Sequence, residues 1–212
     1  MKILLLSDGI YPYVLGGMQK HSASIGIELV KQGYSVDLYH FVPKGNSIPT
    51  KEEVNRFHFN SNKGFNKIFC LYFPTSIRFP GHYLWNSYRY SKSVFEIIKK
   101  NNFSYDFIYS KGFTSWRLLY KRKELIFKPK IGVKFHGYEM YQYAPNFKIR
   151  LQHYMLRRFV KKINQKADYV FSYGGKITNI ISDINVDENK ILEIPSAINK
   201  SWINEKKLNI SK

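Results

Sequence analysis

Short apolar segments alternate along the chain with longer segments in which apolar residues recur every three or four positions. We predict strands at the short segments, which lie at residues 2–7, 35–42, 106–110, 130–135, 169–172 and 191–194. We predict helices at the longer segments, which run over residues 18–32, 82–100, 116–125, 147–166 and 175–184. Strands alternating with helices are typical of a parallel sheet covered on both sides. The pattern therefore predicts an α/β protein with an open, mainly parallel sheet and helices on both faces.

Two segments between these elements have weaker patterns. Residues 46–59 are mostly polar, and we predict a loop there with a short strand at residues 56–59. Residues 68–73 form a short apolar run that fits either a strand or a buried loop.

The sequence gives no signal for a membrane span, a secretory leader or a disulfide. No run of about 18 apolar residues occurs. The segment before Asp8 has one lysine and too few apolar residues for a secretory signal. Cys70 is the single cysteine, which excludes an intrachain disulfide and a four-cysteine zinc site. We therefore expect a cytoplasmic protein.

The chain is strongly basic. Its 34 Lys and Arg residues outnumber 15 Asp and Glu residues, so the 212 residues carry a formal net charge of +19. Such a charge attracts nucleic acid, anionic lipid or phosphorylated substrates. It could equally reflect a compositional bias toward Lys, Asn, Ile, Tyr and Phe. We find no RNA-binding signature beside it and expect no nucleic-acid partner.

Gly16 and Gly17 lie between the first predicted strand and the first predicted helix. Backbone N–H groups at the start of a helix bind anions, and glycine lets a phosphate approach closely. The spacing is neither GxGxxG nor GxxxxGK[ST], and no acidic residue ends the second strand to hold a ribose. A dinucleotide-dependent dehydrogenase and a P-loop NTPase are therefore disfavoured. An ordinary tight turn is the alternative explanation for the glycine pair.

His136 and Lys111 each follow a predicted strand, and open α/β sheets bind ligands beyond the carboxyl ends of their strands. There the imidazole of His136 could donate to a sugar hydroxyl or stabilise developing charge. It could also be a histidine satisfied within the core. Lys111 could meet a phosphate or simply be solvated, and Glu139 could support the site or face water.

Taken in order, these motifs resemble the N-terminal domain of glycosyltransferase family 4, whose members have the GT-B fold. The resemblance is carried by KILLLSD at residues 2–8, Tyr11-Pro12, Gly16-Gly17, Gln19, His21, KQGY at 31–34, residues 36–39 and 106–109, His136-Gly137, ADYV at 167–170 and KILEIP at 190–195. Each motif is weak alone, but their order and spacing along nearly the whole chain make the set specific.

The resemblance implies that residues 1–195 are the Rossmann-like, acceptor-binding N-terminal domain of a two-domain enzyme. Such an enzyme moves a sugar from a nucleotide-sugar donor to a glycan or lipid-linked acceptor in cell-surface polysaccharide or glycolipid synthesis. The resemblance also implies retention of anomeric configuration and no required metal or cofactor. Gly16 and Gly17 would then contact the donor diphosphate, and His136 would be the catalytic histidine that faces the transferred sugar. The remaining candidate substrate contacts are Tyr11, Gln19, His21, Lys111, Tyr138 and Glu139.

Two features depart from the family pattern. The usual Pro-Asn-Gly stretch reads Pro195-Ser196-Ala197 here, and Asn199 replaces the acid that often follows, so their linker hydrogen bonds are in doubt. Residues 196–212 are polar and lysine-rich and look like the start of an interdomain linker. The donor-binding C-terminal domain is absent from these 212 residues, so we expect this chain alone to be inactive in transfer.

The predicted helix at residues 147–166 is basic and amphipathic. No acidic residue occurs between Met140 and Ala167, and Met155, Leu156, Phe159, Val160 and Ile163 share one helical face. Such a helix can lie on an anionic membrane, which makes the inner membrane face a candidate location. Its apolar face could equally pack on the sheet.

Aromatic residues are also dense between residues 65 and 85, where they could contact a lipid-linked acceptor or fill the core. The alternative to an enzyme is a non-catalytic Rossmann-like module that binds anionic lipid or a partner protein.

Overall fold

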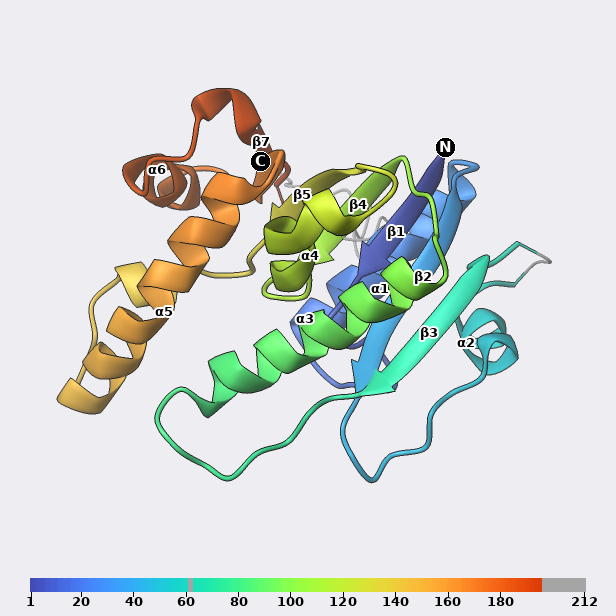
Figure 1. The fold of residues 1–212 in the computed structure, drawn as a ribbon, viewed down its shortest axis with the longest axis horizontal. Coiled ribbons are helices and arrows are strands. Elements are labelled where there is room, and N and C mark those ends of the chain that lie inside the picture. Colours follow the sequence, from blue (N-terminus) through green and yellow to red (C-terminus); the bar gives the residue numbers. More distant parts are fainter. Residues whose placement is uncertain (61–62, 196–212) are drawn as a thin grey trace, which may run out of the picture.

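The computed structural model describes residues 1–60 and 63–195, so the predicted linker at residues 196–212 lies outside the described residues. Seven strands form one sheet in the order β3-β2-β1-β4-β5-β6-β7 (Figure 1), and every pair of neighbours is parallel. The strands are β1 (Lys2–Leu6), β2 (Ser35–Val42), β3 (Lys67–Tyr72), β4 (Phe107–Lys111), β5 (Lys130–Lys134), β6 (Tyr169–Ser172) and β7 (Ile191–Glu193). The expected open parallel sheet is confirmed.

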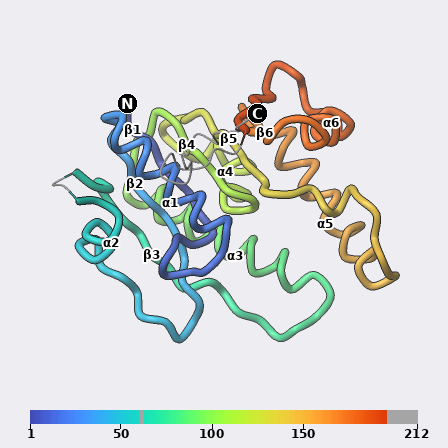
Figure 2. Tube along the Cα trace, turned by 180° about the vertical axis from the view of Figure 1, so that it is seen from behind, coloured from blue at the N-terminus to red at the C-terminus, as the bar shows by residue number. Residues whose placement is uncertain are grey.

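Helices cover both faces of this sheet (Figures 1 and 2). They are α1 (Gly17–Lys31), α2 (Lys51–His58), α3 (His82–Lys100), α4 (Trp116–Lys121), α5 (Phe147–Lys166) and α6 (Lys176–Asp183), with short 3-10 turns η1 (Arg122–Glu124), η2 (Glu139–Tyr141) and η3 (Glu188–Lys190). Side chains of a strand alternate between faces, and β1 shows this directly. Leu4 and Leu6 pack in the core that α3, α4 and α5 cover, whereas Leu5 packs in the core beneath α1 and α2.

Helix α2 occupies residues for which we predicted a loop and a short strand, so that prediction is wrong. The hydroxyl of Thr50 accepts a hydrogen bond from the backbone N–H of Glu53 at 3.2 Å, and the Glu53 carboxylate accepts from the N–H of Thr50 at 2.7 Å. This capping box satisfies two N–H groups at the start of the helix. Val54 is the buried residue of α2, so the helix has too few apolar positions for a periodic pattern.

Segment 68–73, which the sequence left open between a strand and a buried loop, is the edge strand β3. It pairs with β2 from Asp37↔Lys67 to Val42↔Tyr72. Its residues are half-buried or exposed because only one neighbour covers an edge strand.

The strand order determines where a ligand would bind. The chain runs from β1 outward through β2 and β3 and then returns to place β4 on the other side of β1. In open α/β sheets the crevice forms at this switch of direction, beyond the carboxyl ends of the two central strands. The loops that follow β1 and β4 are therefore the first place to look for a site.

Candidate active site

Three of the predicted site residues converge at the carboxyl edge of the sheet. Lys111 ends β4, and its Nζ lies 2.7 Å from Nδ1 of His21 and 3.3 Å from Nε2 of His136. His21 lies near the start of α1, and His136 follows β5. The two imidazole rings meet edge to face with centroids 5.2 Å apart. The fold thus gathers two imidazoles around one amine at the switch point; we call these three residues the His–Lys–His cluster.

The pairing of β4 with β5 places a second lysine beside Lys111. Lys111 is in register with Lys134, and each residue is only 1% exposed. Lys134 donates to the carbonyl of Ile194 at 3.2 Å, and its Nζ lies 3.8 Å from the centroid of the Tyr173 ring. Within the described part of the chain, neither lysine forms an ion pair with a carboxylate. The charge of Asp8 acts on Lys111 without forming an ion pair, and two buried amines with no direct ion pair among the described residues favour an anion at this edge.

Burial and mutual repulsion change the protonation of the cluster. Burial, with the charge of Lys134, lowers the pKa of Lys111 to about 7. Burial lowers the pKa of Lys134 to about 8. The pKa of His21 falls to about 3 and that of His136 to about 4, because burial and the nearby lysines both oppose a charged imidazole. Both imidazoles are therefore neutral near neutral pH, and each has one N–H and one lone pair.

Sequence reasoning missed three groups of this site. Tyr173 follows β6, and its hydroxyl lies 2.7 Å from Nδ1 of His136. Asp8 follows β1; its Oδ1 is buried and has no hydrogen-bond partner among the described residues, and burial raises the pKa of this carboxyl. The same search beyond strand ends that found His136 would have found Tyr173 and Asp8. Lys134 is the third missed group. Nothing in the sequence singled it out, because a lysine at the end of a strand is usually exposed to water.

The predicted glycine pair lies at the start of α1. Gly16 precedes the helix with a φ of 150°, and Gly17 is its first residue. Both are exposed, and a methyl group at Gly17 would meet nothing within 4 Å. Gln19 is buried and donates from Nε2 to the carbonyl of Asp8 at 3.2 Å, so its side chain ties the start of α1 to the end of β1. The N–H groups of the first turn thus lie near the end of β1, and no side chain of the described residues caps them.

Three other predicted contacts lie outside the His–Lys–His cluster. Tyr11 packs against Phe57 of α2, with ring centroids 5.9 Å apart. Tyr138 is fully buried, and its hydroxyl donates to Oδ1 of Asn164 at 3.2 Å, so the structure places this side chain in the core rather than at a ligand. The predicted contact of Tyr138 with substrate therefore does not fit its position. Glu139 is exposed, and its carboxylate folds back against the backbone of Gly137.

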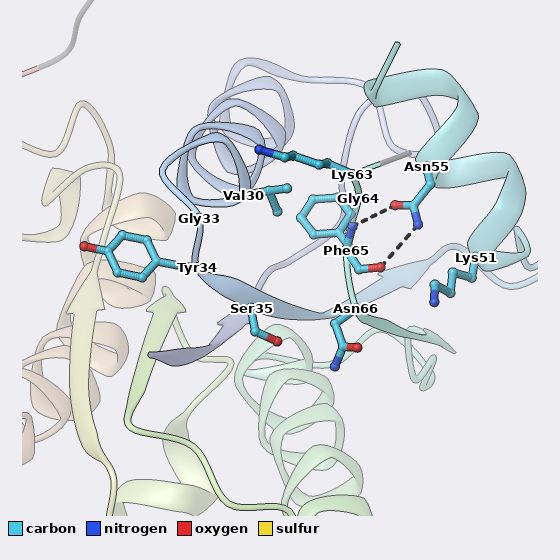
Figure 3. A pocket seen from close by; sticks show the side chains of 10 residues that line it. All are labelled: Val30, Gly33, Tyr34, Ser35, Lys51, Asn55, Lys63, Gly64, Phe65 and Asn66. Atoms are coloured by element: carbon cyan, nitrogen blue, oxygen red, sulfur yellow. Dashed lines mark hydrogen bonds between the residues drawn. The ribbon is translucent and has the colours of Figure 1, made fainter. Parts of the chain in front are cut away.

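No three His, Cys, Asp or Glu side chains gather as a metal site within residues 1–60 and 63–195. A separate hollow of about 530 Å³ lies at the opposite edge of the sheet, by the amino ends of β2 and β3 (Figure 3). Oδ1 of Asn55 accepts from the backbone N–H of Phe65 at 2.9 Å, and Nδ2 of Asn55 donates to the carbonyl of Phe65 at 3.2 Å. Nδ2 of Asn66 donates to the carboxylate of Asp37 at 2.7 Å. These polar groups already have partners, and the hollow is not part of the candidate site.

The parallel sheet in this order has a basic cluster at its switch point and a helix start beside it. This combination defines a Rossmann-like domain suited to a phosphate-bearing ligand. The sequence profile of Glycosyltransferase Family 4 matches residues 15–202. The chain belongs to this family, and its fold is that of a GT-B glycosyltransferase domain. No curated protein is a significant match in sequence.

Solved structures agree on the fold. Sucrose-phosphate synthase from Thermosynechococcus elongatus has a TM-score of 0.65 and 14% identity, with 93% of this chain and 48% of that chain covered. The catalytic domain of starch synthase IV from Arabidopsis thaliana, bound to ADP and acarbose, has a TM-score of 0.56 and 13% identity, covering 92% of this chain and 51% of that one. The chain thus spans about half the length of these proteins.

A UDP-GlcNAc 2-epimerase from Neisseria meningitidis, bound to UDP-GlcNAc, is also similar. Its TM-score is 0.55 and its identity 13%, with 91% of this chain and 45% of that chain covered. An epimerase is not a transferase, so the likeness of fold does not by itself decide the reaction.

Proposed function

We propose that this chain is the acceptor-side part of a retaining glycosyltransferase that moves a sugar from a nucleotide-sugar donor to a glycan or lipid-linked acceptor. Membership of Glycosyltransferase Family 4 supports transfer over epimerisation. The observation that carries the proposal is the convergence of His21, Lys111 and His136 beside the start of α1. These residues come from separate elements and meet at the switch of strand direction, where open α/β sheets bind their ligands.

The proposed roles follow from the chemistry of each group. The N–H groups beginning at Gly17, with the helix dipole behind them, would hold the donor diphosphate. Lys111 and Lys134, at the ends of β4 and β5, would add positive potential beside the diphosphate. The proposal therefore needs no metal or other cofactor. His136 would face the transferred sugar with a neutral ring, which places no positive charge of its own beside the donor.

The test uses the full-length protein, because this chain spans about half the length of the similar solved proteins. Purified protein is incubated with UDP-, GDP- and ADP-sugars, and a membrane lipid extract or a glycan fraction supplies the acceptor. We expect saturable release of nucleotide with one donor, a product with the donor's anomeric configuration, and no transfer by residues 1–212 alone. Absence of transfer with every donor, or inversion of configuration, would contradict the proposal.

A specific surface favours an additional membrane role. Tyr143 is 87% exposed, and Phe147 and Tyr154 in the first half of α5 are 77% and 74% exposed, with the exposed cations Lys148 and Arg150 among them. Of the two alternatives that the sequence left open for the apolar face, the second half of α5 shows packing on the sheet, with Val160 and Ile163 buried. The exposed half projects beyond the sheet (Figure 1).

The start of α3 extends this surface. Met155 in the middle of α5 lies against Gly81, which precedes α3, so the start of α3 is beside α5. Phe79, Tyr83 and Trp85 are exposed there, although Phe65 of the same aromatic-rich segment is buried as expected for a core residue. Aromatic rings interspersed with Lys and Arg suit an anionic membrane surface, from which a lipid-linked acceptor would come. We propose peripheral attachment at the cytoplasmic membrane face through this surface. No helix of the described residues is long and apolar enough to cross a bilayer.

Vesicle sedimentation tests the membrane role. Vesicles of phosphatidylcholine with phosphatidylglycerol should bind the protein at low salt and release it as salt rises, because the attraction is partly electrostatic. The double variant Phe147→Ser, Tyr154→Ser should lose binding. Ile126→Ser is the matched control, since Ile126 is 82% exposed near the opposite edge of the sheet. Binding without dependence on charge or on these residues contradicts the role. Vesicle binding by a full-length protein without transfer activity would favour the non-catalytic module.

A further inference from the structure

The hydrogen bonds around Lys111 constrain where the protons of two imidazoles lie. Nζ of Lys111 lies within hydrogen-bond distance of Nδ1 of His21 and Nε2 of His136, at 2.7 and 3.3 Å. An ammonium group has three N–H donors and no lone pair. While Lys111 is charged, each of these two ring nitrogens must therefore accept, and an accepting nitrogen carries no proton. The single proton of each neutral ring is then on its other nitrogen.

The two rings consequently have opposite tautomers. His136 carries its proton on Nδ1 and donates it to the hydroxyl oxygen of Tyr173, which is 2.7 Å away. His21 carries its proton on Nε2. Both nitrogens of His136 are thus engaged within the protein, one by Lys111 and one by Tyr173.

The Nε2–H of His21 is the remaining imidazole donor of the cluster. Among residues 1–60 and 63–195, Nε2 of His21 has no hydrogen-bond partner, and it is not one of the buried polar atoms without a partner, so these residues leave it open. His21 lies one helical turn after Gly17, at the proposed phosphate-binding start of α1. An oxygen acceptor of the donor, from its phosphate or its sugar, would meet this N–H.

We propose that Lys111 is a positioning residue that holds His21 and His136 in opposite tautomers, so that the Nε2–H of His21 is directed to the ligand. The part that concerns the ligand rests on the proposed function; the tautomers do not. Other groups that face the cluster are Lys134 from β5, Asp8 after β1 and Tyr109 on β4, whose ring centroid is 5.7 Å from Nζ of Lys111. The competing arrangement has a neutral Lys111 that accepts a proton from His136.

Long-range ¹H–¹⁵N spectra of histidine-labelled residues 1–212 distinguish these arrangements, because protonated and unprotonated ring nitrogens differ widely in ¹⁵N shift. The variants His21→Gln and His136→Gln assign the signals. At about pH 5.5, below the pKa of Lys111 and above those of both imidazoles, we expect the Nε2–H tautomer for His21 and the less common Nδ1–H tautomer for His136. An Nε2–H tautomer at His136 would overturn the proposal whatever the activity of the enzyme.

Two variants separate positioning from general disruption. Lys111→Met removes the donor, and we expect both imidazoles to average between tautomers and titrate closer to an ordinary histidine. Lys134→Met is the control, because Lys134 is equally buried but touches neither imidazole; it should leave the tautomer of His21 unchanged. Unchanged tautomers in Lys111→Met would also overturn the proposal. If Lys111→Met does not fold, the spectrum of the unmodified chain decides alone.

In the full-length enzyme, the ligand part has its own readout. His21→Phe keeps an aromatic ring but removes the N–H, and we expect a rise in the donor KM of about tenfold with a smaller change in kcat. An unchanged donor KM would contradict a ligand contact by His21. If the tautomers are as proposed but the donor KM is unchanged, Lys111 positions the two rings and His21 does not contact the donor.

Discussion

Nζ of Lys111 lies 2.7 Å from Nδ1 of His21, although 90 positions separate the two residues in the chain. The contact exists because β4 returns to the side of β1, which brings the end of β4 to the start of α1. His136 joins them from the neighbouring strand β5. The candidate site is thus a product of the strand order, and its protonation follows first from the burial of each group and then from the charges of the lysines.

The stability of the chain should rise with pH between pH 7 and about pH 8.5. The pKa of Lys111 is lowered to about 7 and that of Lys134 to about 8, while in the unfolded chain both lie near 10.5. In this window the unfolded chain binds more protons than the folded chain, so raising the pH favours folding. Urea unfolding at several pH values measures the free energy of unfolding. In Lys111→Met the free energy of unfolding should rise less steeply with pH than in wild type. An equal rise in the two proteins would contradict the lowered pKa of Lys111.

Gly17→Ala should separate folding from phosphate binding. A methyl group at Gly17 meets nothing within 4 Å, so the variant should unfold at the same urea concentration as wild type. The methyl would stand in the approach of the diphosphate, and we expect transfer by the full-length enzyme to fall about 10- to 100-fold. Gly16→Ala differs, because Gly16 has a φ of +150° and its methyl would overlap the amide of Gln19, so stability should fall too. Full activity of Gly17→Ala would exclude close contact with the donor.

Asp168 should contribute to stability as an ion-pair and hydrogen-bond partner. Its carboxylate lies 2.7 Å from Nη2 of Arg122 and accepts from the backbone N–H of Ile131 at 2.8 Å. Burial opposes its charge, but these hydrogen bonds and the charges of Arg122 and Lys130 outweigh burial, so the pKa of Asp168 is lowered. Asp168→Asn should cost about 1–3 kcal/mol in the free energy of unfolding at pH 7.

The pH dependence supplies the control for Asp168. Because the pKa of Asp168 is lowered in the folded chain, its carboxylate stabilises the fold at any pH above 3.8, the ordinary pKa. This contribution is lost as the pH falls through the pKa that Asp168 has in the folded chain. The difference between wild type and Asp168→Asn should therefore shrink in acid. A difference that stays constant down to pH 3 would assign the effect to packing.

Elements with dense apolar patterns could be predicted from the sequence, and sparse ones could not. Strand β2, helices α3 and α5 and strand β6 begin and end as predicted, because each buries enough of its face to show a clear period. Helix α2 buries Val54, and its start was encoded instead in the capping pair Thr50 and Glu53.

The site divides in a similar way. His136, Lys111 and His21 could be proposed from motif order and from their places after strands or at a helix start. Their mutual contact could not, because periodicity does not give the strand order that joins β4 to β1. The burial of the Lys134 and Tyr138 side chains could not be predicted either, because it depends on residues that pack against them from other elements.

The rate of sugar transfer by the full-length protein, measured side by side for wild type, His136→Ala and the control His82→Ala, tests the central claim most directly. His82 lies outside the His–Lys–His cluster, and its ring is hydrogen-bonded to the carbonyl of Phe79 at the start of α3. We predict a loss of about 100-fold or more for His136→Ala and an unchanged rate for His82→Ala. Equal rates for wild type and His136→Ala, with donor and acceptor held fixed, would contradict the placement of the active site.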